Sequence, residues 1–366
     1  MYLQFAVLKM KINPEMIVLS RKMRGMTQAE LSRAIGQGQA RISKLEGGIN
    51  TDVSEALLDM LCSALNVPIE FLTQEEELLS VGSSAFYYRK KSDLSALDRD
   101  KIHAVVNLYR IYLKKLLPSV EIESKRVLPV FDINEDFGGS AQKAAQALRS
   151  FWMLPDGPIK NITSIIESAG IIIIPCEFGT RSMDATAIRI TEMPPMIFIN
   201  KDIPVDRWRF TLAHELGHLV MHDIPNPNME EEADCFAAEF LMPEIEIRAQ
   251  FQCMSSIRLE HLATLKPYWR VSMAALLVRA SDLGFINPVQ KSRLWARMSQ
   301  LGWRTKEPHP IPKEQPTTLK KIIEYFAESL EYSIDDFQKL FRVYKDDFKQ
   351  LYDVVFGSER PILRAV

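Results

Sequence analysis

The chain has 366 residues, of which 47% are hydrophobic and 25% are charged, and its formal net charge is −2. This composition is typical of a folded soluble protein and excludes an intrinsically disordered chain, while the length predicts two or three domains. The near-neutral charge excludes a globally basic nucleic-acid-binding protein, so any DNA contact must come from a local patch.

The cysteine pattern and the lengths of the apolar runs indicate in which cellular compartment the protein acts. The four cysteines are scattered without a CxxC pair, which fits a reducing cytosol rather than a disulfide framework. No apolar run approaches the length of a membrane span, so we expect a cytoplasmic protein without membrane contact. The first nine residues, MYLQFAVLK, lack a basic start and a cleavage site. We expect an extra strand or an extension upstream of Met10 rather than a signal peptide.

Residues 13–73 predict five short helices. Thr27–Glu30 reads as a capping box at the start of the second helix, in which each end side chain satisfies the other's backbone donor. The glycine turn at 36–38 separates that helix from a third one over 39–46. A helix, a short glycine turn and another helix are the signature of a helix-turn-helix, which we place at residues 10–74.

Residues 75–138 are expected to form a linker followed by an amphipathic helix. The linker contains the acidic residues 75–77 and the sequence Val-Gly-Ser-Ser at 81–84. Apolar residues at helical spacing predict the amphipathic helix near residues 98–117. Its apolar stripe needs a partner, and packing within its own chain is favoured over a dimer seam.

Residues 139–286 predict a second domain of mixed structure. Helices are expected near 140–152 and 162–169, strands at 171–174, 186–190 and 196–199, and then several further helices. Residues 287–366 predict a helical C-terminal region without recognisable chemistry. The fold class is therefore α+β, with an all-α five-helix N-terminal domain, a mixed domain and a helical C-terminal region.

The stretch TLAHELGHLVMH at residues 211–222 carries metal-binding chemistry. His214 and His218 lie four residues apart, so both point to one side of a helix and can hold one Zn²⁺. Glu215 falls beside that face, as in the HExxH arrangement, and can act as a general base. The neighbouring residues are apolar, so the helix is buried, and buried polar groups need partners. We expect Gly217 to allow close approach of another backbone.

The next helix, after residue 226, offers a third ligand. Projected at about 100° per residue, Glu230 and Asp234 lie on one side of it. We expect Glu230 to bind the metal and Asp234 to accept the far N–H of a ligating histidine. Glu232 and Glu239 are expected on a solvated face. His222 is expected near the helix-end carbonyls, although it remains an alternative ligand.

Recognition of a family adds to this interpretation. The block FTLAHELGHLVMH, followed by EEEADCFAAEFLMP, resembles the ImmA/IrrE family of zinc metallopeptidases over roughly residues 140–285. The resemblance implies a zincin-like (gluzincin) domain with a small sheet. It also implies Zn²⁺ bound by His214, His218 and Glu230, with Glu215 as the catalytic base. Asp234 stands where many members carry Asn. A substrate peptide is expected along a strand edge, for which 186–190 is a candidate, although an internal strand there is as compatible.

Residues 13–73 resemble the Cro/repressor-type (XRE) helix-turn-helix family, in which the second helix of the motif enters the major groove. The matching sequence runs from Thr-Gln-Ala-Glu-Leu at 27–31 to Ile-Ser-Lys-Leu-Glu at 42–46. The residues expected to contact double-stranded operator DNA are Gln28, Gln39, Ala40, Arg41, Ser43 and Lys44. The near-neutral charge of this segment predicts a homodimer. A small helical protein-binding domain is the alternative.

These patterns predict a DNA-binding transcription regulator that carries a zinc endopeptidase. Its substrate is expected to be a protein or peptide, such as a helix-turn-helix repressor, whose cleavage derepresses phage, mobile-element, toxin–antitoxin or defence genes. The alternative is a regulator whose metallopeptidase-like domain is a sensor and cuts nothing. A general protease is disfavoured, because secretion signals and propeptide features are absent.

Overall fold

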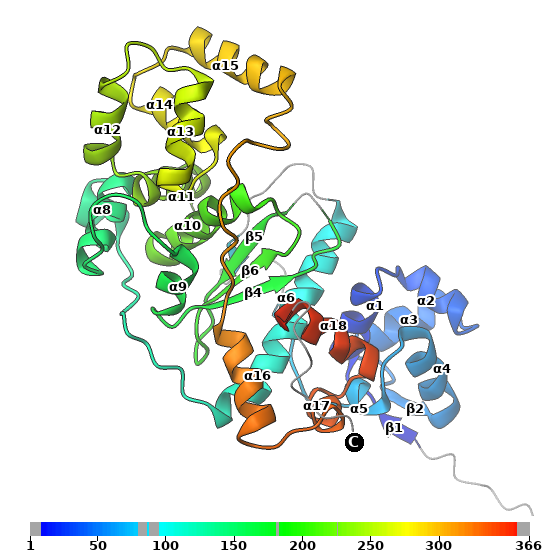
Figure 1. Cartoon of the computed structure of the whole chain (residues 1–366). Helices are drawn as coiled ribbons and strands as arrows, with labels where there is room; N and C mark the ends of the chain where they lie inside the picture. Colours follow the sequence, from blue (N-terminus) through cyan, green and yellow to red (C-terminus); the bar gives the residue numbers. More distant parts are fainter. Residues whose placement is uncertain (1–8, 80–85, 88–94, 181–182, 225, 357–366) are drawn as a thin grey trace, which may run out of the picture.

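The computed structural model describes residues 9–79, 86–87, 95–180, 183–224 and 226–356. The expected N-terminal extension at 1–8 and the linker residues 81–84 lie outside the described residues. The fold is α+β, as predicted: a helical head at the N-terminus, a small sheet in the middle and a helical C-terminal region (Figure 1).

The head contains the five predicted helices. They are α1 (Pro14–Met23), α2 (Gln28–Ala34), α3 (Gln39–Glu46), α4 (Glu55–Leu65) and α5 (Ile69–Leu72). The capping box forms as predicted, with Thr27 accepting from the Glu30 N–H and the Glu30 carboxylate accepting from the Thr27 N–H. A two-stranded ribbon of β1 (Lys9–Lys11) and β2 (Asp52–Ser54) is an addition to the all-helical expectation.

The central sheet has the strand order β3-β5-β6-β4. Its strands are β3 (Phe86–Tyr87), β4 (Ile172–Cys176), β5 (Ala185–Ile188) and β6 (Met196–Asn200). β4 runs parallel to β6, and the other neighbours are antiparallel. β5 pairs with β6 on one side and with β3 on the other. The candidate edge is therefore an internal strand where β3 covers Ala187 and Ile188.

Both faces of the sheet are buried, which explains why its strands are apolar at nearly every position. Alternate residues such as Ile172 and Phe198 face α6 (Ala96–Leu116), whose apolar stripe thus packs within its own chain. Ile173 and Ile197 face the opposite way, into a second core beneath α10 (Val205–Met221). The first core continues into the head, so the head and the sheet share one hydrophobic cluster.

The second core is covered by a group of helices around α10 (Figure 1). They are α7 (Ile133–Phe137), α8 (Ala141–Phe151), α9 (Ile162–Glu167), α11 (Met229–Leu241), α12 (Glu244–Gln252), α13 (Leu259–Trp269), α14 (Met273–Asp282) and α15 (Pro288–Gln300). The neighbour of Gly217 is the ring of Phe236 in α11, only 3.0 Å from where a Cβ would stand. The expectation of a backbone neighbour was therefore wrong: the glycine makes room for an aromatic side chain.

The C-terminal region touches both halves of the molecule. An extended strap, residues 307–317, returns from α15 past the helices around the second core to α16 (Thr318–Glu328), α17 (Ile334–Phe341) and α18 (Lys345–Phe356) (Figure 1). Within the strap, buried Glu314 forms an ion pair with buried Arg209 of α10. In α18, Asp347 forms an ion pair with Arg24 of the head at 2.9 Å. These contacts connect the C-terminal region to the head and to α10.

Candidate functional site

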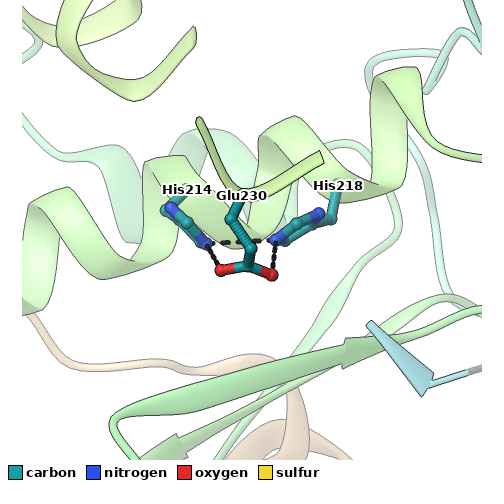
Figure 2. Close-up of side chains that lie close together, drawn as sticks. All are labelled: His214, His218 and Glu230. Carbon is teal, nitrogen blue, oxygen red and sulfur yellow. Dashed lines mark hydrogen bonds and ion pairs between the residues drawn. The ribbon is translucent and has the colours of Figure 1, made fainter. Parts of the chain in front are cut away.

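Three side chains converge between α10 and α11. The Nε2 atoms of His214 and His218, on successive turns of α10, lie 3.0 Å apart. The carboxylate of Glu230, at the start of α11, faces both rings, with oxygens 3.6 Å from His214 Nε2 and 3.5 Å from His218 Nε2 (Figure 2). The potential ligand atoms all lie within 4.8 Å of one another.

The chemistry of this cluster fits a zinc ion. Both Glu230 oxygens are buried, and neither has a hydrogen-bond partner among the described residues. Two imidazole nitrogens and one carboxylate, with a fourth position open, are a donor set that catalytic Zn²⁺ takes in proteins. A dication between the three groups would satisfy the buried carboxylate oxygens, which otherwise carry a desolvation cost.

Glu215 lies beside the cluster, with its side chain buried between α10 and the sheet. Burial raises the pKa of the Glu215 carboxyl to about 8. The charge of His214 and a hydrogen bond from the backbone of Ala187 lower the pKa, but their effect is smaller. A cation bound at the neighbouring ligands would favour the ionised form. Glu215 therefore holds a carboxyl group that can gain and release a proton near neutral pH.

His214 is oriented from behind by Asp234. Its Nδ1 lies 2.8 Å from Asp234 Oδ1, so Nδ1 carries the proton and Nε2 turns its lone pair toward the cluster. Burial acts to lower the pKa of His214, but the hydrogen bond to Asp234 and the nearby carboxylate of Glu230 outweigh it and raise the pKa to about 10 in the absence of a metal. A bound cation would displace the proton from Nε2 and leave the proton that Nδ1 donates to Asp234.

His218 is oriented by a longer chain of hydrogen bonds. Its Nδ1 lies 3.0 Å from Nδ1 of His222, and Nε2 of His222 lies 2.9 Å from Glu232 Oε2. One set of neutral tautomers satisfies every link and directs the lone pair of His218 Nε2 toward the proposed metal site. In it, His222 donates from Nε2 to Glu232 and accepts at Nδ1 from His218.

The roles of His222 and Glu232 were missed by sequence reasoning. The spacing of four residues between His218 and His222 was the available signal, because it places both rings on one side of α10. Glu232 was expected in solvent, but it lies opposite His222. Glu239 was also expected in solvent, but it is buried and forms an ion pair with Arg279. These two expectations were wrong because α11 is contacted on several sides, whereas the projection assumed one buried stripe.

A cleft of about 720 Å³ opens beside the cluster. His214 and Glu215 form part of its wall, as do Asp184 and Ala185 next to and within β5. Its apolar lining includes Met183, Phe210, Val278 and Trp295. The cleft can hold a peptide segment against Glu215 and His214, one of the three proposed ligands.

The head presents α3 to solvent. Its expected contact residues Gln39, Ala40, Arg41, Ser43 and Lys44 are all exposed. Ile42 and Leu45, on the opposite side of the helix, are buried in the head. Gln28 is half-buried, and its side-chain amide donates to Glu46 at 2.8 Å, so one of its donors is already occupied.

Comparison with known families now identifies both halves. Residues 166–281, which include the three converging side chains and Glu215, match the M78 peptidase family model, described as the IrrE N-terminal-like domain. Residues 19–72 match the helix-turn-helix family model. The chain thus carries both a helix-turn-helix domain and an IrrE-like domain. No match was found among curated proteins.

The two family matches confirm the predicted combination of a Cro/repressor-type helix-turn-helix head with an IrrE-like domain. The protein is thus a DNA-binding regulator that carries a metallopeptidase-like domain. None of the helices in the described part of the chain is both long and apolar enough to cross a membrane.

Proposed function

We propose that the IrrE-like domain is an active zinc endopeptidase that the helix-turn-helix head directs to DNA. Its substrate is a regulatory protein, such as a helix-turn-helix repressor, whose cleavage derepresses phage, mobile-element, toxin–antitoxin or defence genes. The observation that carries this proposal is the convergence of His214, His218 and Glu230 beside a buried Glu215 at the wall of a cleft.

The proposed chemistry divides between the ligands and the base. His214, His218 and Glu230 would hold Zn²⁺, which would supply Lewis acidity for the scissile carbonyl and the attacking water. Glu215 would accept a proton at a carboxylate oxygen as the water oxygen bonds to the scissile carbonyl carbon, and would pass it to the amine nitrogen as the C–N bond breaks. Asp234, and the relay of His222 and Glu232, hold the two imidazole rings with Nε2 toward the metal.

The sensor alternative also has a supporting observation. The head, α6 and one face of the sheet share a single hydrophobic cluster, so a change in the metal domain can reach the head through packed elements. In that case metal would alter DNA affinity without any cleavage.

One experiment separates the two functions. The zinc-loaded protein is mixed with a repressor encoded beside it, and cleavage and DNA affinity are both measured. Cleavage that disappears in Glu215→Gln supports the peptidase. An intact repressor together with zinc-dependent DNA affinity supports the sensor.

We further propose that the chain is organised as a head at 10–74, a connecting segment at 75–138, a peptidase domain at 139–286 and a helical region at 287–366. We propose that it acts in the cytoplasm as a homodimer, because two heads would supply the affinity that one near-neutral head lacks. Sedimentation of the full chain tests the dimer: a monomer that binds operator DNA with full affinity would contradict it.

A further inference from the structure

The stretch formed by α15 and the turn after it is strongly positive. Residues 288–306 contain five basic residues and no acidic residue, in a chain whose net charge is −2. Within the described part of the chain, none of the five forms an ion pair with a carboxylate. The next acidic residue, Glu307, is already paired with Lys266 at 2.9 Å. The positive charge of this stretch is therefore not neutralised by a carboxylate of the residues that the structure describes.

The two faces of α15 differ in what they contact. Met298 is buried, and Leu294 and Trp295 are half-buried and pack against the second core. Arg293 and Arg297 are both exposed and lie one turn apart, on the opposite side of the helix. Together with exposed Ala296 and Gln300 they make the arginine face of α15. Figure 1 shows α15 at the periphery of the molecule, away from the head.

The arginine face does not belong to the proposed catalytic cleft. Trp295 lines that cleft, and the guanidinium of Arg304 lies 5.0 Å from the centre of its ring. By helical projection, Arg293 and Arg297 lie about 160° from Trp295 around the axis of α15. An occupant of the arginine face therefore differs from a peptide bound in the cleft.

We propose that the arginine face of α15 is a second nucleic-acid contact, which binds the phosphate backbone of duplex DNA without reading its sequence. Arginine and glutamine side chains on a rigid helix donate hydrogen bonds to phosphate oxygens. The helix-turn-helix head already places the chain on DNA, so a duplex is the polyanion available to it. An acidic protein is less favoured, because no aromatic residue lies on this face and its exposed apolar side chain, Val289, is smaller than the aromatic anchors that hold protein interfaces.

The test compares four full-length proteins on a random-sequence duplex over a series of salt concentrations. They are the wild type, Arg293→Ala with Arg297→Ala, Arg41→Ala with Lys44→Ala in the head, and the combination of all four. We expect the head variant to keep salt-sensitive binding. Adding the α15 substitutions to it should weaken that binding and lower the slope of log affinity against log salt by about 1.8, since each phosphate contact contributes about 0.9.

The control adds Lys143→Ala and Lys160→Ala to the head variant. Both lysines are exposed and lie outside α15, and replacing them removes the same charge as the two arginine substitutions. The control should bind the duplex like the head variant. Equal affinity and slope for the α15 and control proteins would overturn the proposal. So would a result in which the α15 substitutions abolish binding to poly-glutamate but leave duplex binding unchanged, because the face would then recognise acidic protein.

Discussion

The Nδ1 atoms of His218 and His222 lie 3.0 Å apart on α10, so a buried histidine rather than a carboxylate stands directly behind the second proposed zinc ligand. Glu232 completes the chain at 2.9 Å from the other nitrogen of His222. The first proposed histidine ligand, His214, contacts its carboxylate, Asp234, without an intermediary. The two imidazoles thus reach the same orientation by different routes.

The relay predicts that His222 controls zinc affinity without binding zinc. His222→Leu should weaken zinc binding about 10–100-fold, as losses of groups behind a metal ligand do. His222→Asn should weaken it less, because the amide oxygen can still accept from His218. Competition with a chromogenic chelator measures both. If the His222→Leu variant binds zinc as tightly as the His222→Asn variant, His222 contributes only packing and not a hydrogen bond to His218.

Substitutions of Glu215 and Glu230 are predicted to affect zinc affinity and cleavage rate differently. Glu230→Gln should lower zinc affinity, since it removes a charged ligand, and activity should fall with it. Glu215→Gln should keep the zinc and lose on the order of a hundredfold or more in cleavage rate. Glu231→Gln is the matched control, because Glu231 lines the cleft without joining the three converging groups. Zinc loss in Glu231→Gln but not in Glu230→Gln would shift the assignment by one residue.

The α3 face predicts a separable DNA defect. Gln39→Ala, or Arg41→Ala with Lys44→Ala, should weaken operator binding and leave zinc content unchanged, because these side chains are exposed on the head. Gln37→Ala is a useful comparison, since Gln37 reaches DNA only indirectly in this account, through its 2.6 Å hydrogen bond to Arg41. A gel shift on the gene's own promoter provides the measurement, and unchanged binding in both α3 variants would refute the assignment of α3.

The strap predicts a large loss of stability at one residue. Glu314→Ala leaves Arg209 as an unpaired charge in the interior, and breaking a buried pair costs about 3–5 kcal/mol. Glu244→Ala breaks the exposed pair with Arg248 within α12 and should cost only about 0.3–0.5 kcal/mol. Urea unfolding at constant zinc measures both. Equal losses would mean that the strap does not stabilise α10.

Sequence patterns predicted most elements whose apolar residues have a clear period. The capping box at Thr27 and the run of isoleucines that became β4 are examples, since local hydrogen bonding and burial decide them. The helix α15 falls within the region predicted to be helical but was not predicted as a separate element, because its one fully buried residue, Met298, leaves almost no apolar stripe. The strap lies within the region predicted to be helical but is not helical, and its buried contacts could not be predicted because the partners of Glu314 lie more than 100 residues away.

The site likewise contains residues that the sequence relates locally and residues that only the tertiary fold brings together. His214, Glu215 and His218 lie within five residues, so helical geometry alone relates them. Glu232 and His222 meet only because α11 folds back along α10, and no period in either helix reports that contact.

New protein N-termini, counted by terminal labelling and mass spectrometry, test the peptidase activity most directly. Zinc-loaded wild type and zinc-loaded Glu215→Gln are each added to an extract of the host cells. We expect a small set of new N-termini with the wild type that is absent with Glu215→Gln and after chelation. Identical N-termini with both proteins, each shown to retain its zinc, would contradict it.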